Sequence, residues 1–186
     1  MTLFLLGLVI FFGAHLFTAL ARDARAGLVV KLGEGPYKGL YSLVSLVGFV
    51  LIIMGWGGAD ASVLYAAPEW MRHIVYVLVL FAFVLLAAAY LPAGKIAAVT
   101  QHPMLAGVKL WAFAHLLVNG EVRSVILFGA FLAYAVVDRI ALKRRGAPVR
   151  AAGPARNDLI AVIAGAAFYA FVALFAHRYI AGVALF

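Results

Sequence analysis

Six apolar stretches of about membrane-spanning length constrain the fold of this chain more than any other feature. A helix needs about 20 mostly apolar residues to cross the hydrocarbon core of a bilayer. The stretches that reach or approach this length are Thr2–Ala21, Gly39–Gly57, Trp70–Leu91, Met104–Val118, Val122–Leu142 and Leu159–Ile180. We therefore predict an all-α polytopic membrane bundle of about six transmembrane helices, forming one integral membrane domain over residues 1–186.

The composition excludes the main alternatives to a membrane protein. Of the 186 residues, 67% are hydrophobic and 12% are charged, whereas a soluble domain is about half apolar and about a quarter charged. Too little polar surface is present to cover a water-soluble globule, and the same excess of apolar residues excludes disorder. The chain has no cysteine, so it has no disulfide framework, no thiolate zinc site and no thiol nucleophile.

The fourth stretch is the weakest of the six. Met104–Val118 has 15 residues and would rise about 22 Å, against a hydrocarbon core of about 30 Å. We expect it either to extend backwards through Lys95–Gln101, with a bend before Pro103, or to be partly re-entrant. Short or interrupted spans are common at substrate and ion sites in membrane proteins.

The basic residues predict an orientation in the membrane. Lysine and arginine total 15, against 7 acidic residues, and 11 of the basic residues fall in or beside the first, third and fifth connections. Because cytoplasmic loops carry an excess of lysine and arginine, we place these connections in the cytoplasm and both termini outside. The basic charge therefore indicates a lipid bilayer as partner, and no pattern typical of nucleic-acid binding accompanies it.

His15 is the first candidate for a functional residue, because ionisable groups inside a bilayer are costly. It lies about 10 Å from the predicted cytoplasmic edge, and Arg22 follows seven residues later. On one continuous helix the two side chains would share a face. An imidazole is a suitable ligand for haem iron, and a guanidinium at the membrane edge suits a haem propionate. The alternatives are a histidine bonded to a neighbouring helix and an arginine that only sets topology.

His115 is the second candidate, in the short fourth stretch with Lys109 on the preceding turns. The triplet Ala114–Leu116 repeats Ala14–Leu16, which hints at an inverted repeat of two three-span halves. His73 and His177 fall near the predicted outer face and could join His115 in a metal cluster. No zinc-binding spacing supports that cluster.

Several motifs together resemble the NnrU family of bacterial inner-membrane proteins, which are often associated with denitrification. That family is similar to the 15-cis-zeta-carotene isomerase of plants and cyanobacteria. The resemblance covers about Leu3 to Arg145, and the motifs that carry it are His15 to Arg22, Leu32–Glu34, Tyr41–Leu46, Gln101–Met104 and Trp111–His115.

The resemblance implies haem b bound by two histidines, at positions that match His15 and His115 here. It further implies redox-linked chemistry on a lipophilic substrate, denitrification-associated or isomerase-like. In the isomerase branch a cysteine three residues before the second histidine is implicated in a redox-dependent ligand change. Ala112 stands at that position, so we expect no cysteine-dependent ligand change in this chain.

Two other functions remain open from the sequence, which does not decide whether the protein is an enzyme. One is a cofactor-free membrane scaffold or transporter-like protein, in which His15 and His115 only bond to neighbouring helices. The other is a membrane methyltransferase of the isoprenylcysteine type, which His102-Pro103 at the start of a late span resembles. Those enzymes need an extended polar C-terminal segment, whereas Arg145–Asn157 is short and precedes another apolar stretch.

Overall fold

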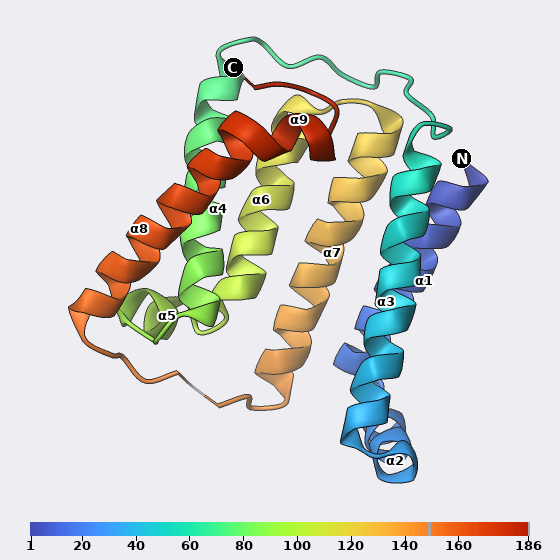
Figure 1. The fold of residues 1–186 in the computed structure, drawn as a ribbon, viewed down its shortest axis with the longest axis vertical. Helices are drawn as coiled ribbons and strands as arrows, with labels where there is room; N and C mark the ends of the chain where they lie inside the picture. Colours follow the sequence, from blue (N-terminus) through green and yellow to red (C-terminus); the bar gives the residue numbers. More distant parts are fainter. Residues whose placement is uncertain (149, 186) are drawn as a thin grey trace. The chain divides into compact units, whose positions relative to one another are not determined.

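The computed structural model describes residues 1–148 and 150–185, and helices dominate it (Figure 1). The long helices are α1 (Thr2–Leu20), α3 (Glu34–Trp56), α4 (Met71–Tyr90), α6 (Pro103–Val118), α7 (Val122–Arg144) and α8 (Ala155–Phe171). A π-helical turn, η1 (Val172–Ala176), joins α8 to α9 (His177–Ile180), and short helices α2 (Arg22–Leu32) and α5 (Lys95–Thr100) occupy two connections. The all-α fold and the six predicted helical stretches are confirmed; when α8, η1 and α9 are taken as one run, the ends differ from the prediction by five residues at most.

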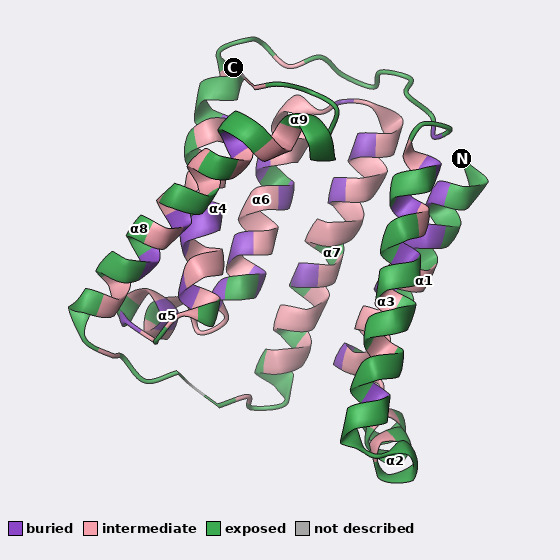
Figure 2. Cartoon of the chain, in the orientation of Figure 1, coloured by how far each residue is buried: buried purple, intermediate pink, exposed green. Residues whose placement is uncertain are grey.

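Within the described residues, five helical segments are long and apolar enough to cross a membrane: α1, α3, α4, α7 and the run Ala155–Ile180. Helix α6 has 16 residues and rises about 24 Å, so the fourth span is short as predicted. Large apolar side chains are exposed along the long helices, among them Leu43 at 58% and Ile163 at 60%. Figure 2 shows this exposure on much of α3 and α8. Acyl chains would cover such surfaces, as a bilayer-embedded protein requires.

The helices group into two compact units, and each is described by itself. Unit 1 comprises Met1–Ala66 and Asn119–Gly146, and unit 2 comprises Ala67–Val118 and Ala147–Phe186. Helices α1, α2, α3 and α7 therefore belong to unit 1, although α7 follows α6 in the chain. Helices α4, α5, α6, α8 and α9 belong to unit 2.

In unit 1, α1 packs along α3 and against α7. Two glycines permit the close approach of α1 and α3. A Cβ atom at Gly7 would lie 2.6 Å from the backbone nitrogen of Ile52, and one at Gly48 would lie 2.6 Å from that of Phe11. Small residues at such crossings are the usual means by which membrane helices gain close packing. The apolar core beside this crossing consists of Phe4, Leu8, Phe12, Ile52 and Ala59.

Arg123 ties the connection after α3 to the start of α7. Its Nε donates a hydrogen bond to Glu121 at 2.7 Å, and its guanidinium lies 4.6 Å from the centre of the Trp56 ring. Its backbone N–H donates to the carbonyl oxygen of Asp60 at 2.9 Å. Cation–π and ion-pair contacts of this kind hold an exposed loop in one position.

Helix α2 occupies a connection for which the sequence analysis made no helix prediction. Its sequence lacks proline, and arginine, alanine and leucine favour a helix. The helical conformation is interrupted at Ala21, with φ −94° and ψ 57°. Helix α2 ends before Gly33, whose φ of 84° is a conformation that glycine adopts readily. Pro36 then stands in the first turn of α3, where proline costs no intrahelical hydrogen bond.

In unit 2, α4 packs against both α6 and α8. Glycines again permit close contact at both crossings. A Cβ atom at Gly107 of α6 would lie 2.9 Å from the carbonyl oxygen of Ala82, and one at Gly165 of α8 would lie 2.6 Å from the Cα of Val84. The helix that carries His115 is thus held closely against α4.

The connection from α4 to α6 contains the bend predicted before Pro103. Gln101, with φ 61°, separates α5 from α6, and Pro103 begins α6. Lys95–Thr100 forms a short helix of its own before this bend, so the residues before Pro103 are helical but do not continue α6 as one unbroken helix. The carboxylate of Asp158, on α8, accepts the backbone N–H groups of Lys95 and Ile96 at 2.9 Å each and so fixes the start of α5.

Candidate functional site

His15 lies on α1 among aromatic side chains of unit 1, and it is half-buried. Its ring centre is 4.2 Å from that of Phe11, one turn earlier, and 5.5 Å from those of Tyr41 on α3 and Tyr134 on α7. Its Nδ1 lies 2.6 Å from the carbonyl oxygen of Phe11. Three helices therefore position this imidazole.

The bond to Phe11 fixes the tautomer of His15. A carbonyl oxygen can only accept a hydrogen bond, so Nδ1 carries the proton and donates it. The lone pair of the neutral ring then resides on Nε2. Metal-ligating histidines commonly have this arrangement, because a carbonyl bond to one ring nitrogen orients the other toward the metal.

His115 repeats this arrangement on α6 of unit 2. Its Nδ1 lies 2.8 Å from the carbonyl oxygen of Trp111, four residues earlier, and the two ring centres are 4.9 Å apart. The same reasoning places its lone pair on Nε2. Ala112 and Ala114 beside it are fully buried, so close packing on small residues holds this part of α6.

The structure places the two predicted haem ligands in different units, His15 in unit 1 and His115 in unit 2. Each is therefore characterised within its own unit. What they share is local: an aromatic residue four positions earlier, a bond from Nδ1 to the carbonyl oxygen of that residue, and partial burial.

Arg22 does not continue the helix of His15, and the expectation of one shared helix face is wrong. Helix α1 ends at Leu20, and Arg22 begins α2 after the break at Ala21. Its role toward a propionate stays a prediction from the sequence. In the structure Arg22 lines a pocket of about 480 Å³ in unit 1, together with Thr18, Ala19, Arg25, Tyr37, Lys38, Tyr41, Asp138 and Arg145.

The pocket adjoins the surroundings of His15, because Tyr41 lines the pocket and also contacts the imidazole. Thr18 connects them as well, since its hydroxyl donates to the backbone carbonyl oxygen of His15 at 2.7 Å. The hydroxyl of Tyr134, whose ring also lies beside the imidazole, donates to the pocket residue Asp138 at 3.5 Å. Polar groups therefore continue from His15 to the pocket.

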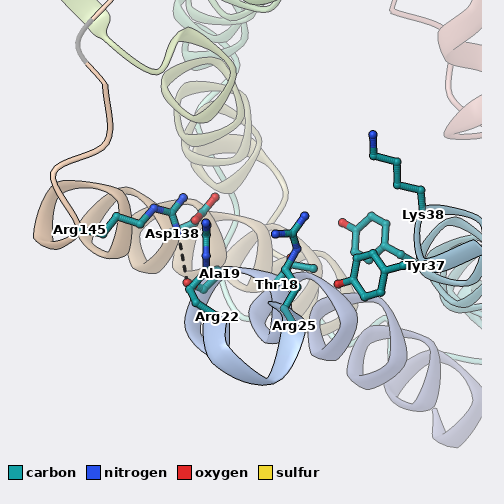
Figure 3. A pocket seen from close by; sticks show the side chains of 9 residues that line it. Thr18, Ala19, Arg22, Arg25, Tyr37, Lys38, Asp138 and Arg145 are labelled. Carbon is teal, nitrogen blue, oxygen red and sulfur yellow. Dashed lines mark hydrogen bonds between the residues drawn. The ribbon is translucent and has the colours of Figure 1, made fainter. Parts of the chain in front are cut away.

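Four cations and one carboxylate line the pocket, so its electrostatic character is positive. Figure 3 shows Arg22 and Arg145 near Asp138, and Arg25 near Tyr37. Arg145 donates to the carbonyl oxygen of Ala19 at 3.4 Å, and the guanidinium of Arg25 lies 5.4 Å from the centre of the Tyr37 ring.

The outward metal cluster, which the sequence left open without support from its spacing, is not formed among the described residues. No group of three or more potential metal ligands occurs among residues 1–148 and 150–185. His73 lies near the carbonyl oxygen of Trp70, at 3.4 Å, and His177 near that of Val183, at 2.7 Å. Lys109 is half-buried on α6.

Sequence reasoning missed the tyrosines beside His15 and the pocket itself. Tyr41 stands in one of the motifs that carried the family resemblance, but its contact with His15 depends on how α3 packs on α1. Tyr134 and Asp138 are four residues apart, a spacing that places both on one face of α7. That spacing is the one feature of the sequence that could have indicated the bond between Tyr134 and Asp138.

The helices and their exposed apolar surfaces define a multi-pass integral membrane protein, and each of its two helical units contains one of the two predicted ligand histidines. The chain belongs to the NnrU protein family, because the model of that family matches residues 3–185. The match extends the resemblance from Arg145 to almost the end of the chain. The curated proteins and the solved structures yield no match.

Proposed function

We propose that this protein binds haem b through His15 and His115 and takes part in redox-linked chemistry on a lipophilic substrate. The observation that supports the proposal is the hydrogen bond that each histidine makes from Nδ1 to the carbonyl oxygen four residues earlier. These bonds leave Nε2 as the basic nitrogen of both rings, which is the chemistry an axial haem ligand needs.

The residues around His15 fit the same role. Phe11, Tyr41 and Tyr134 surround His15 with rings, and such rings exclude water and lower the local polarity. The exclusion of water and the low local polarity both affect the redox potential of a bound haem. The haem would supply one-electron chemistry, while the chain's own part is to orient two imidazoles and keep their surroundings apolar. We further place the protein in a bacterial inner membrane with its basic connections in the cytoplasm.

The test is a visible absorption spectrum of the detergent-purified protein, first oxidised and then reduced with dithionite. We expect a sharp Soret band and resolved α and β bands after reduction, as six-coordinate haem b gives. H15A and H115A should each abolish this spectrum while membrane insertion persists. H73A is the control, because His73 is exposed and its Nδ1 also faces a carbonyl oxygen, that of Trp70, at 3.4 Å; its spectrum should match that of the wild type.

Two outcomes would overturn the proposal. A featureless wild-type spectrum, even after expression with added haem precursor, would leave a cofactor-free scaffold or transporter-like protein as the better description. Retention of the haem spectrum by both H15A and H115A would remove the two histidines as ligands. Binding of an adenosyl cofactor instead of haem would favour the methyltransferase alternative.

A further inference from the structure

The basic pocket of unit 1 has the features of a built anion site. Its volume of about 480 Å³ falls within the range of about 300–1,000 Å³ that small-molecule sites occupy. The residues come from α1, α2, α3, α7 and the residue after α7. Segments far apart in the sequence therefore bring their charges to one place, which a basic loop alone would not do.

Three guanidinium groups in the pocket are not held in close ion pairs, although the Asp138 carboxylate lines the same pocket. Among residues 1–148 and 150–185, neither Arg22, Arg25 nor Arg145 forms an ion pair. The fourth cation, Lys38, is paired with Glu34 at 2.7 Å on an exposed surface. Guanidinium groups bind phosphate through two parallel hydrogen bonds. Three guanidiniums and one carboxylate in the pocket leave an excess of positive charge, which favours a phosphate-bearing ligand.

The pocket lies where the spans of unit 1 end, and lipid headgroups lie at the ends of membrane-spanning helices. Helix α1 ends at Leu20, α3 begins at Glu34 and α7 ends at Arg144. From the pocket, α3 continues along its span with Leu40 exposed to 52% and Val44 to 36%, each three residues beyond a lining tyrosine. An acyl chain attached to a phosphate in the pocket would therefore find apolar surface next to it.

The side chains of helix α2 also favour a location of the pocket in the headgroup region of the membrane. None of its residues is buried, and Leu28, Val30 and Leu32 are exposed at 39%, 85% and 44%. Arg22 and Arg25 of the same helix line the pocket. A helix with exposed apolar residues and basic residues lies favourably in the interface of an anionic membrane.

We propose that this pocket binds the phosphate headgroup of an anionic membrane lipid, with Arg22, Arg25 and Arg145 as its main contacts. The pocket selects a single lipid, in contrast to the diffuse attraction that every cytoplasmic lysine and arginine exerts on anionic membranes. This assignment does not depend on haem binding.

The test uses phosphatidylglycerol titrated into the full-length protein in detergent, with bound lipid counted by native mass spectrometry. We expect one phosphatidylglycerol per chain, bound at least tenfold more tightly than phosphatidylcholine. R25Q/R145Q should weaken phosphatidylglycerol binding at least tenfold. The matched control is K31Q/R144Q, which removes the same charge from exposed positions outside the pocket and should change the affinity by less than twofold.

Several results would overturn the lipid assignment. Equal losses in the two double variants would show diffuse charge attraction in place of a site, as would equal binding of phosphatidylcholine. Saturation by inorganic phosphate over the same concentration range would assign the pocket to a soluble anion. Loss of haem from R25Q/R145Q with unchanged lipid binding would assign it to haem carboxylates. Should the double variant fail to fold, R25Q and R145Q alone must each weaken binding at least threefold.

Discussion

The Nδ1 of His15 lies 2.6 Å from the carbonyl oxygen of Phe11, one helical turn earlier on α1. This bond lies within α1, and its effect is on the protonation of the imidazole itself. It leaves Nε2 as the nitrogen with the lone pair, before any cofactor is present. His115 and Trp111 make the same bond on α6.

The tautomer of His15 is directly testable in the haem-free protein. In ¹⁵N NMR spectra of the detergent-solubilised chain, we expect the proton on Nδ1 of both His15 and His115, because a carbonyl oxygen accepts from that atom. His73 is the control, since it is exposed and its Nδ1 is 3.4 Å from the nearest carbonyl partner; it should show a mixture of tautomers. A proton on Nε2 of His15 would contradict the structure.

The close crossing of α1 and α3 predicts different effects of two glycine substitutions on one helix. G7A should lower the free energy of unfolding by about 1–3 kcal/mol, as overpacking does, because its new methyl group would meet the backbone of Ile52. G13A has nothing within 4 Å of the new methyl group, so it should be neutral or stabilising by about 0.5–1 kcal/mol through helix propensity. Thermal unfolding in detergent measures both. Equal melting temperatures would contradict the packing of α1 on α3.

Hydropathy predicted the spans because a bilayer demands long apolar helices whatever their tertiary contacts. It could not predict which spans pack together. Helix α7 joins α1 and α3 in unit 1 through contacts such as Phe12 with Phe131, whose ring centres are 4.9 Å apart. Nothing in the local pattern of either helix specifies that partner, because apolar residues cover most of each surface.

Helix α2 and the role of Arg22 show a second limit. A charged segment between two spans has the pattern of a connection, and the sequence gives no sign of the break at Ala21 because alanine favours helices. A continuous helix would place Arg22 on the face of His15, whereas α2 carries it into the pocket with Arg145, 123 residues later. The pocket required tertiary structure to be seen.

The repeated triplet around His15 and His115 does not correspond to an equivalent position in the two units. In unit 1 the histidine is on α1, which packs against both α3 and α7. In unit 2 the helix that packs against two long neighbours is α4, whereas His115 is on α6. The likeness of the two histidines is therefore local, in the aromatic residue and the carbonyl bond one turn earlier.

Asp158 predicts a local loss of order at the start of α5. D158A removes the acceptor of the Lys95 and Ile96 N–H groups, and loss of such a cap costs about 0.5–2 kcal/mol. We expect faster hydrogen exchange at these two amides, measured by mass spectrometry after proteolysis. D158N keeps one acceptor oxygen and should show a smaller effect. E69A, at an exposed position before α4, is the control and should leave the exchange of α5 unchanged.

Asp60 predicts a pH dependence in the connection after α3. The hydroxyl and the backbone N–H of Ser62 both donate to its carboxylate and hold the pKa of Asp60 below its ordinary value, with the hydroxyl as the larger cause. A carboxyl whose pKa is lowered by folding stabilises the loop above its unfolded pKa of about 3.9, and that stabilisation is lost as the pH falls through the lower, folded pKa. The loop should therefore be insensitive to pH between about 5 and 8 and should loosen only in more acidic solution.

In S62A the pKa of Asp60 should rise toward its ordinary value, because only the backbone donor remains. A ¹³C NMR titration of the Asp60 carboxyl in both proteins measures this rise, and identical titration curves would show that the Ser62 hydroxyl does not bond to Asp60.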